Sequence, residues 1–225
     1  PSFAAAATVI WQNDCSDTLD WVFTNTSIPA PGGTPLDWRI ETNTDLNAIQ
    51  VTPLPSSLYP FASNTASNGF LFISSDAEPS NGDGNGTPIE AWATIDTLID
   101  LSAWPYVQLT FEHNYRWWQD TRSIRISTDA GSSWTDLPVT SLEGGDVVDG
   151  YPNLQNTSNP EVTTYNISSI AGGQDSVLVQ IYYFDNDMWG WWWAVDDIRI
   201  ELFNIYMTKG LVSENYNFSF TYKSL

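Results

Sequence analysis

Residues 107–113, Val-Gln-Leu-Thr-Phe-Glu-His, alternate apolar and polar side chains. Residues 176–183, Ser-Val-Leu-Val-Gln-Ile-Tyr-Tyr, form a second run rich in β-branched and aromatic residues. Successive side chains of a strand point to opposite faces, so the first run predicts a strand with one buried face. The second predicts a strand that is buried on one or both faces. Helical periodicity is almost absent from the chain.

Further segments with this character are separated by turn residues such as Pro31-Gly32-Gly33 and Gly172-Gly173. About a dozen short strands at this spacing predict an all-β fold in which two antiparallel sheets pack as a sandwich or close as a barrel. The predicted strands besides the two above are 20–26, 37–42, 48–52, 70–74, 90–95, 123–128, 133–137, 162–167, 192–201 and 216–222.

The charge of the chain excludes several classes of partner. The 225 residues contain 27 Asp and Glu but only 7 Lys and Arg, which gives a formal net charge of −20. Nucleic acid and anionic membranes attract basic proteins, so neither is an expected partner. No apolar stretch is long enough to span a membrane. The composition, rich in Trp, Thr, Ser and Asn and poor in Lys, suits a secreted or cell-surface protein.

The length predicts one main domain, with a change of character near residue 203. Both lysines, Lys209 and Lys223, follow that point. We therefore expect a binding domain over residues 1–203, and a tail over 204–225 that is either a last strand or a connection to a further domain or partner chain. Cys15 and His113 are the single cysteine and histidine, so an internal disulfide and a His-rich zinc site are both excluded.

Three segments in order resemble a known family. The first is Gly84–Thr94 with the run Ile-Asp-Leu-Ser at 99–102, the second is Leu109–Tyr115 followed by Ile126–Trp134, and the third is Trp191–Ile200. Together they resemble the MAM-like jelly roll, including the cleaved-adhesin and haemagglutinin (choice-of-anchor type) domains attached to secreted bacterial proteases. Animal MAM domains carry paired cysteines, so the disulfide-free bacterial branch is the better match. The resemblance covers about residues 8–203 and implies a two-sheet antiparallel jelly roll with a binding or adhesion role, often with structural calcium.

Acidic residues spread along the chain are candidate ligands for that calcium. The loop Asn81–Gly86 matches the opening of an EF-hand loop, but Trp92 occupies the place of the bidentate Glu. A jelly-roll site could instead gather distant carboxylates, and oxygen donors in that number suit Ca²⁺. The alternative is a solvated polar loop. The candidates are Asp14, Asp17, Asp76, Asp83, Asp196 and Asp197.

Asp196 is the best single candidate for a metal ligand. By alternation it shares a face with Ala194, Ile198 and Ile200, which are apolar. A carboxylate on that face requires a cation or several donors. Asp197 would then face the other way, beside Arg199, which is its alternative partner.

The tryptophans are the candidate ligand surface. An exposed indole ring suits the C–H face of a sugar, while neighbouring Asp, Asn and Gln can pair with its hydroxyls. Adjacent residues of a strand point to opposite faces, so two neighbouring rings cannot both lie on one buried face. The alternative for each ring is that it packs in the core. The candidates are Trp117, Trp118, Trp189, Trp191 and Trp192.

The residues give little support for catalysis. His113 shares a face with Leu109 and Phe111, so we expect a core histidine. Asp129 lies in the pattern Ser127-x-Asp129-x-Gly131-x-x-Trp134, which predicts a hairpin turn. A glycosidase or lyase that uses Glu112 and Asp129 is the enzymatic alternative, but Asp129 is already committed to its turn.

We therefore expect a calcium-stabilised, non-catalytic module that recognises a glycan or a protein surface. A structural subunit of a surface assembly, or an accessory domain of a larger secreted protein, is the alternative suggested by the tail.

Overall fold

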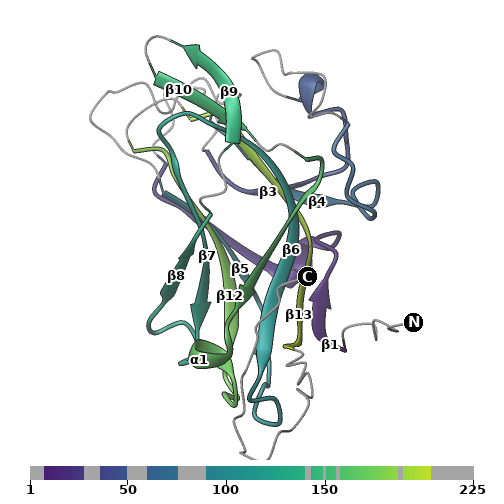
Figure 1. Cartoon of the computed structure of the whole chain (residues 1–225), viewed down its shortest axis with the longest axis vertical. Coiled ribbons are helices and arrows are strands. Elements are labelled where there is room, and N and C mark those ends of the chain that lie inside the picture. The colour runs from purple at the N-terminus through teal and green to yellow at the C-terminus, as the bar shows by residue number, and fades with distance from the viewer. Residues whose placement is uncertain are drawn as a thin grey trace, which may run out of the picture.

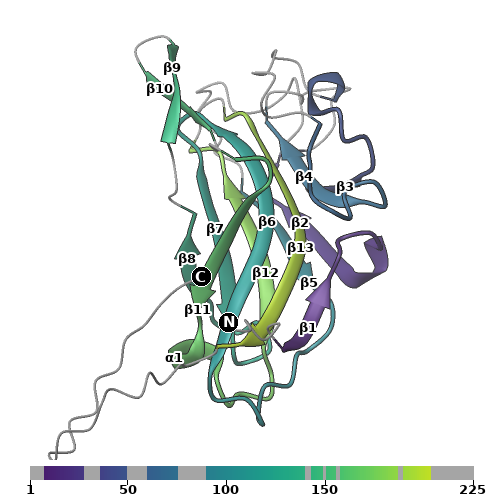
Figure 2. The same ribbon diagram turned by 45° about the vertical axis from the view of Figure 1, so that its right-hand side comes forward.

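The computed structural model describes residues 8–27, 36–49, 60–75, 90–139, 143–148, 151–155, 158–186 and 190–203, of which 143–148 and 151–155 are described by their backbone alone. Within these residues the strands form two antiparallel sheets packed face to face, a jelly-roll sandwich (Figures 1 and 2). The predicted fold class is confirmed. Residues 204–225, Asp76, Asp83 and Trp189 lie outside the described residues.

The larger sheet contains eight strands. Its order is β3 (Arg39–Glu41), β4 (Phe70–Ser74), β13 (Trp192–Leu202), β6 (Val107–Trp117), β10 (Tyr151–Gln155) and β9 (Glu143–Val148), with β1 (Val9–Asn13) beside β13 and β11 (Glu161–Asn166) beside β6. The long strands β6 and β13 run side by side through the centre of the molecule (Figure 2).

The smaller sheet contains five strands in the order β2 (Trp21–Asn25), β5 (Glu90–Ile95), β12 (Leu178–Phe184), β7 (Thr121–Ser127) and β8 (Thr135–Pro138). The helices of the described residues are single turns: η1 (Thr18–Asp20), η2 (Leu46–Ala48) and α1 (Ser168–Ala171). The sheets therefore position almost all side chains.

The main core lies between the sheets, where each contributes every second residue. Ala93, Ile124 and Ile181 face inward from the five-stranded sheet, and Phe111 and Val195 from the eight-stranded sheet. A second apolar cluster includes Phe61, Phe70, Phe72 and Trp192. It covers the outer side of the eight-stranded sheet, because Trp192 lies on the opposite face of β13 from the core residue Val195.

Most predicted strands are present, and the errors concern short elements. The strands predicted at 70–74 and 90–95 have the observed bounds. Strands β1, β9 and β10 were not predicted, since their short sequences have weak alternation. Where 48–52 was predicted as a strand, the described part ends helix η2 instead. The prediction at 216–222 lies outside the described residues.

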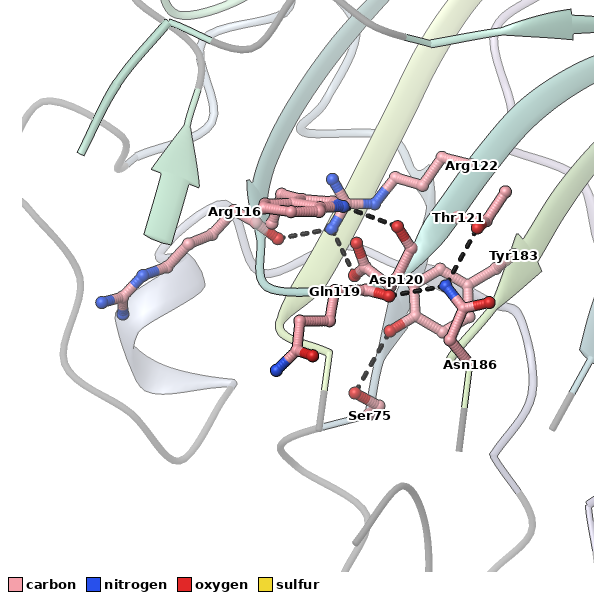
Figure 3. Close-up of polar contacts among 9 residues, drawn as sticks. Ser75, Arg116, Gln119, Asp120, Thr121, Arg122, Tyr183 and Asn186 are labelled. Carbon is pink, nitrogen blue, oxygen red and sulfur yellow. Dashed lines mark hydrogen bonds and ion pairs between the residues drawn. The ribbon is translucent and has the colours of Figure 1, made fainter. Parts of the chain in front are cut away.

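A buried ion pair closes the end of the sandwich where β6 turns into β7. Arg122 Nη2 lies 2.6 Å from Asp120 Oδ2, and the two side chains are 2% and 0% exposed. The same nitrogen donates to the carbonyl oxygen of Arg116 (Figure 3). The guanidinium lies 4.5 Å from the ring centroid of Tyr115. Burial raises the pKa of Asp120, and the charge of Arg122 opposes this rise.

Other contacts attach neighbouring loops to this ion pair. Asn186 donates to the carbonyl oxygen of Gln119, and Tyr183 Oη lies 3.2 Å from Ser75 Oγ (Figure 3). Gly190 passes so close that a Cβ atom there would lie 1.9 Å from Tyr183 Oη, so no side chain fits. The network therefore fixes how the chain enters β7 and β13.

We predict that Arg122→Met lowers the free energy of unfolding by about 3–5 kcal/mol, because it leaves the carboxylate of Asp120 buried without its counter-charge. Arg39→Met is the matched control. Arg39 also covers an aromatic ring, that of Phe72, but its side chain is 36% exposed and its pair with Glu41 should contribute about 1 kcal/mol or less. Denaturant unfolding measures both variants. If the two variants lost the same small amount of unfolding free energy, the prediction would be wrong.

Candidate functional site

The outer face of the five-stranded sheet carries aromatic and polar side chains together. On β5, Ala91 and Ala93 are buried in the core, so Trp92 and Thr94 point outward and are partly exposed. The neighbouring strands alternate in the same way. Their outward residues here are Gln180 and Tyr182 on β12, and Ser123 and Arg125 on β7.

The strand register aligns these side chains in two rows that cross all five strands. From β2 to β8 the first row is Thr24, Trp92, Tyr182, Ser123 and Pro138, and the second is Val22, Thr94, Gln180, Arg125 and Asp136. The first row holds the rings and the second is mostly polar. We call these ten residues the aromatic face.

Two neighbouring rings form the centre of the aromatic face. Trp92 and Tyr182 have ring centroids 6.0 Å apart and planes tilted by 34°. The guanidinium of Arg125 lies 3.5 Å from the centroid of the Tyr182 ring, which is 7% exposed. Burial, with a contribution from Glu90, raises the pKa of Tyr182 to about 12, so its hydroxyl stays protonated. Trp92 therefore offers the more accessible ring.

The polar row is held by hydrogen bonds that leave some groups for a ligand. Arg125 Nε lies 2.5 Å from Asp136 Oδ1, an oxygen that also accepts from Ser123 Oγ at 3.2 Å. Gln180 Nε2 donates to Thr94 Oγ1 at 2.9 Å. The Oε1 atom of Gln180 is buried and has no hydrogen-bond partner among the described residues.

A polar groove of about 560 Å³ lies at the eight-stranded sheet. Strands β1, β6 and β13 contribute to it, together with helix η1 and the segment before β4. Its lining consists of Gln12, Asn13, Asp14, Asp20, Asn64, Thr65, Glu112, Asp197, Ile198 and Arg199.

A β-bulge in β13 shapes this groove. Asp196 pairs with Glu112 and Arg199 with Thr110, so β13 has one more residue than β6 between these pairs. Asp197 is the extra residue, and its backbone has a positive φ of 46°. The groove therefore lies where β13 changes neighbours, from β4 at 192–195 to β1 at 198–201.

The bulge corrects the faces predicted for this strand. Ile198 and Ile200 belong to the core between the sheets, whereas Ala194 belongs to the cluster on the other side. Asp196 shares only the face of Ala194, because the bulge changes the parity. Arg199 is not the partner of Asp197, since its Nε lies 2.6 Å from Glu201 Oε1.

Asp196 and Asp197 share one hydroxyl group. Thr65 Oγ1 lies 3.1 Å from Asp196 Oδ2 and 3.0 Å from Asp197 Oδ1, and it has a single proton to donate. Asp196 is fully buried. Burial raises its pKa to about 7, and the charge of Asp197 adds to this rise. Opposite Asp196, the buried Oε2 atom of Glu112 has no hydrogen-bond partner within the described part of the chain.

The structure brings together part of the predicted metal-ligand set. Asp14 and Asp197 both line the groove, with Asp196 bound to the same hydroxyl as Asp197. Asp17 is exposed and accepts from the Leu19 amide at the start of η1, so its oxygen caps that turn. Among the described residues, no three His, Cys, Asp or Glu side chains form a ready metal-binding group.

The predicted tryptophan surface is partly wrong. Trp192 is fully buried beside Phe72, with ring centroids 6.4 Å apart, and therefore offers no ligand surface. Trp191 is 6% exposed because it lies between Trp118, at 5.7 Å, and the guanidinium of Arg116, at 4.2 Å.

Trp117 and Trp118 are partly exposed, and Trp117 Nε1 donates to the carbonyl oxygen of Asp120. A ligand role for these two stays a prediction.

Two other predictions are confirmed. His113 is a fully buried residue whose Nε2 lies 2.9 Å from Thr163 Oγ1, and burial lowers its pKa to about 3. Asp129 holds a tight turn by accepting hydrogen bonds from the hydroxyl and amide of Ser133 and from the hydroxyl of Ser127, which lower its pKa to about 2.

The residues of the aromatic face are not among those predicted to bind a ligand. The signal was available, because Trp92 and Tyr182 sit at outward positions of two predicted strands. Their pairing across β5 and β12 was not available, since alternation alone does not say which strands are neighbours.

The sequence matches no family model and no curated protein. Among solved structures, a family 11 carbohydrate-binding module from Clostridium thermocellum in complex with a β-1,3-1,4-mixed-linked tetrasaccharide is 11% identical, with 88% of this chain and 97% of that chain covered and a TM-score of 0.43. TmCBM61, in complex with β-1,4-galactotriose, is 6% identical over 82% and 90% of the two chains, with a TM-score of 0.42. The CBM22-1 xylan-binding domain of Xyn10C from Paenibacillus barcinonensis is 8% identical over 88% and 97%, with a TM-score of 0.39.

None of the helices within the described ranges is long and apolar enough to cross a membrane.

We predict that, without divalent cations, raising the pH destabilises the protein through Asp196. The pKa of this carboxyl is about 7 in the folded protein against an ordinary value of 3.8, so the folded state binds its proton more tightly. The contribution of Asp196 to stability is therefore lost as the pH rises from about 4 through about 7. In the presence of EDTA, the melting temperature of the wild type relative to that of Asp196→Asn should fall over this range, because the opposing contribution of His113, whose pKa is lowered to about 3, is common to both proteins.

Asp17→Asn, which changes an exposed capping carboxylate, should keep the pH dependence of the wild type. An unchanged dependence in Asp196→Asn would contradict the prediction.

Proposed function

We propose that this protein is a non-catalytic glycan-binding module whose ligand lies on the aromatic face. The observation that carries the proposal is the Trp92–Tyr182 pair, with a polar row directly beside it in register. A pyranose has apolar C–H faces and polar edges, so it can stack on a ring while its hydroxyls meet polar side chains. The five aligned strands offer such contacts to several consecutive sugars.

The arrangement of the acidic groups favours binding over catalysis. Glycoside hydrolysis needs two carboxyl groups that flank one bond. Asp129 accepts hydrogen bonds within its turn, while Glu112 lies at the groove on the eight-stranded sheet. On the aromatic face, Asp136 is paired with Arg125. We propose no reaction for these residues.

The finer assignment is an extracellular module of the MAM-like, cleaved-adhesin type. It is supported by the sequence segments that resemble that family and by the strongly acidic, lysine-poor composition. A glycan on a cell surface or in an extracellular matrix is then the expected partner. A role as a subunit of a surface assembly depends on residues 204–225, which lie outside the described residues.

We also propose that the groove holds a structural calcium ion. Asp14, Asp196, Asp197 and the hydroxyl of Thr65 would supply its protein ligands, with water completing the coordination. Ca²⁺ prefers such oxygen donors. The fit is supported by two carboxylates that share one hydroxyl and by the unpaired Oε2 atom of Glu112. When bound, the ion would neutralise the carboxylates and connect β1, β13 and the segment before β4.

We predict that Trp92→Ala lowers the affinity for a soluble polysaccharide about ten- to hundredfold, because a large apolar ring leaves the contact. Affinity electrophoresis against galactan, mannan, xylan and mixed-linked β-glucan identifies the polysaccharide, and isothermal titration calorimetry measures its affinity. Trp118→Ala is the control, since Trp118 is also a partly exposed tryptophan but lies outside the aromatic face. Binding that depends on Trp118 and not on Trp92 would move the site to the predicted tryptophan cluster. Failure of the wild type to bind any glycan would reject the proposed function.

We predict that Ca²⁺ raises the melting temperature by several degrees, since an ion bound only to the folded state at a hundredfold excess over its Kd stabilises by about 2.7 kcal/mol. EDTA should reverse the shift, and Asp196→Ala and Asp197→Asn should abolish it. Asp17→Asn should keep it, because Asp17 is occupied at helix η1. A calcium shift that persists in both groove variants would place the ion elsewhere, and no shift in the wild type would reject the calcium proposal.

A further inference from the structure

Arg125 is held in one orientation by contacts on two sides. Its guanidinium lies 3.5 Å from the Tyr182 ring centroid on β12, and its Nε is paired with Asp136 on β8. Asp136 is in turn an acceptor for Ser123. These contacts use the flat face and the Nε atom of the guanidinium. In the described part of the chain its two Nη groups have no hydrogen-bond acceptor, so they offer donors on the aromatic face.

Gln180 supplies an acceptor beside these donors. It pairs directly with Arg125 across β12 and β7, so the two side chains leave the same face of the sheet. Gln180 is 8% exposed, and its Nε2 donates to Thr94 Oγ1 at 2.9 Å. Its Oε1 atom is buried without a partner among the described residues. A buried acceptor of this kind is costly, and a donor from a ligand would remove that cost.

A neighbouring donor and acceptor distinguish a hydroxyl from a carboxylate. A hydroxyl can accept from Arg125 and donate to Gln180 at the same time. An ionised carboxylate can only accept, so it would leave Oε1 unpaired. It would also lie near Asp136 in a chain with a net charge of −20.

We propose that Arg125 and Gln180 are the specificity-determining pair of the aromatic face and select an uncharged, hydroxyl-bearing sugar over a carboxylate-bearing one. The inference rests on the proposed function and adds the chemical class of its ligand. Arg125 thus acts as a positioned hydrogen-bond donor, since Asp136 already balances its charge.

The test uses pairs of soluble polysaccharides that share a backbone, of which one member is neutral and the other bears carboxylates. Hydroxyethylcellulose and carboxymethylcellulose form one pair, and neutral and carboxymethylated galactan, mannan and xylan form three more. We expect the wild type to bind the neutral member of its preferred pair at least about tenfold more tightly. The preference should persist in about 1 M NaCl, where the Debye length is about 3 Å, because it comes from direct hydrogen bonds.

Two substitutions at Gln180 separate the role of the acceptor from that of the fold. Gln180→Met removes Oε1 and should lower the affinity for the neutral glycan about tenfold, which largely removes the preference. Gln180→Glu keeps an acceptor oxygen and should keep the preference for the neutral member. Gln108→Met is the control, because Gln108 is a half-buried strand glutamine on the other sheet. Melting temperatures confirm that each variant is folded.

The outcomes distinguish the two proposals. A preference that disappears in high salt, or that survives in Gln180→Met, would overturn the selection by Arg125 and Gln180. Equal or tighter binding of the carboxymethylated member would do the same, while Trp92-dependent binding would still support the glycan site. Failure of the wild type to bind any of the eight polysaccharides or mixed-linked β-glucan would overturn both.

Discussion

The face of the strand on which a side chain lies is the constraint on which both candidate sites depend. Side chains alternate along a strand, and a shift of one residue moves every later side chain to the opposite face. On β5, β12 and β7 the register runs without interruption, so aromatic and polar positions align across the sheet. On β13 one extra residue interrupts it after Asp196, so Asp196 lies on the outer face with Ala194, whereas Ile198 lies on the core face. The aromatic face thus depends on a continuous strand register, and the groove depends on the bulge that interrupts the register of β13.

Strands whose residues alternate could be predicted from the sequence. The pairing between strands could not. Val107–His113 and Glu90–Ile95 carry the period of a half-buried strand, so β5 could be predicted with its observed bounds and β6 with its observed start, although β6 continues to Trp117. The position of Trp92 beside Tyr182 follows from the pairing of strands distant in sequence, which alternation does not contain. The bulge was missed because Asp197 is the extra residue and nothing in its neighbours marks a break. Trp192 was predicted to face a ligand because alternation places it on the outer face of its strand. That face is covered by the cluster around Phe70, which alternation does not reveal.

Four of the five arginines lie against aromatic rings. The sequence has 7 Lys and Arg in all. Four arginines lie over rings: Arg39 over Phe72, Arg116 over Trp191, Arg122 over Tyr115 and Arg125 over Tyr182. A guanidinium over a ring gains from the electron-rich face and restricts the ring as well. The consequence depends on burial, because Arg122 balances an internal carboxylate whereas Arg125 remains partly open on the aromatic face.

The two candidate sites belong to different sheets, and this separation bears on how they act. The aromatic face lies on the outer side of the five-stranded sheet, whereas Asp196 and Glu112 lie on the side of the eight-stranded sheet away from the shared core. The packed core, with Phe111, Ile181 and Val195, stands between them. A closely packed interior holds both sheets in place. A cation in the groove would therefore act on stability, and the recognition of a glycan would depend on side chains whose positions are fixed by β5, β12 and β7.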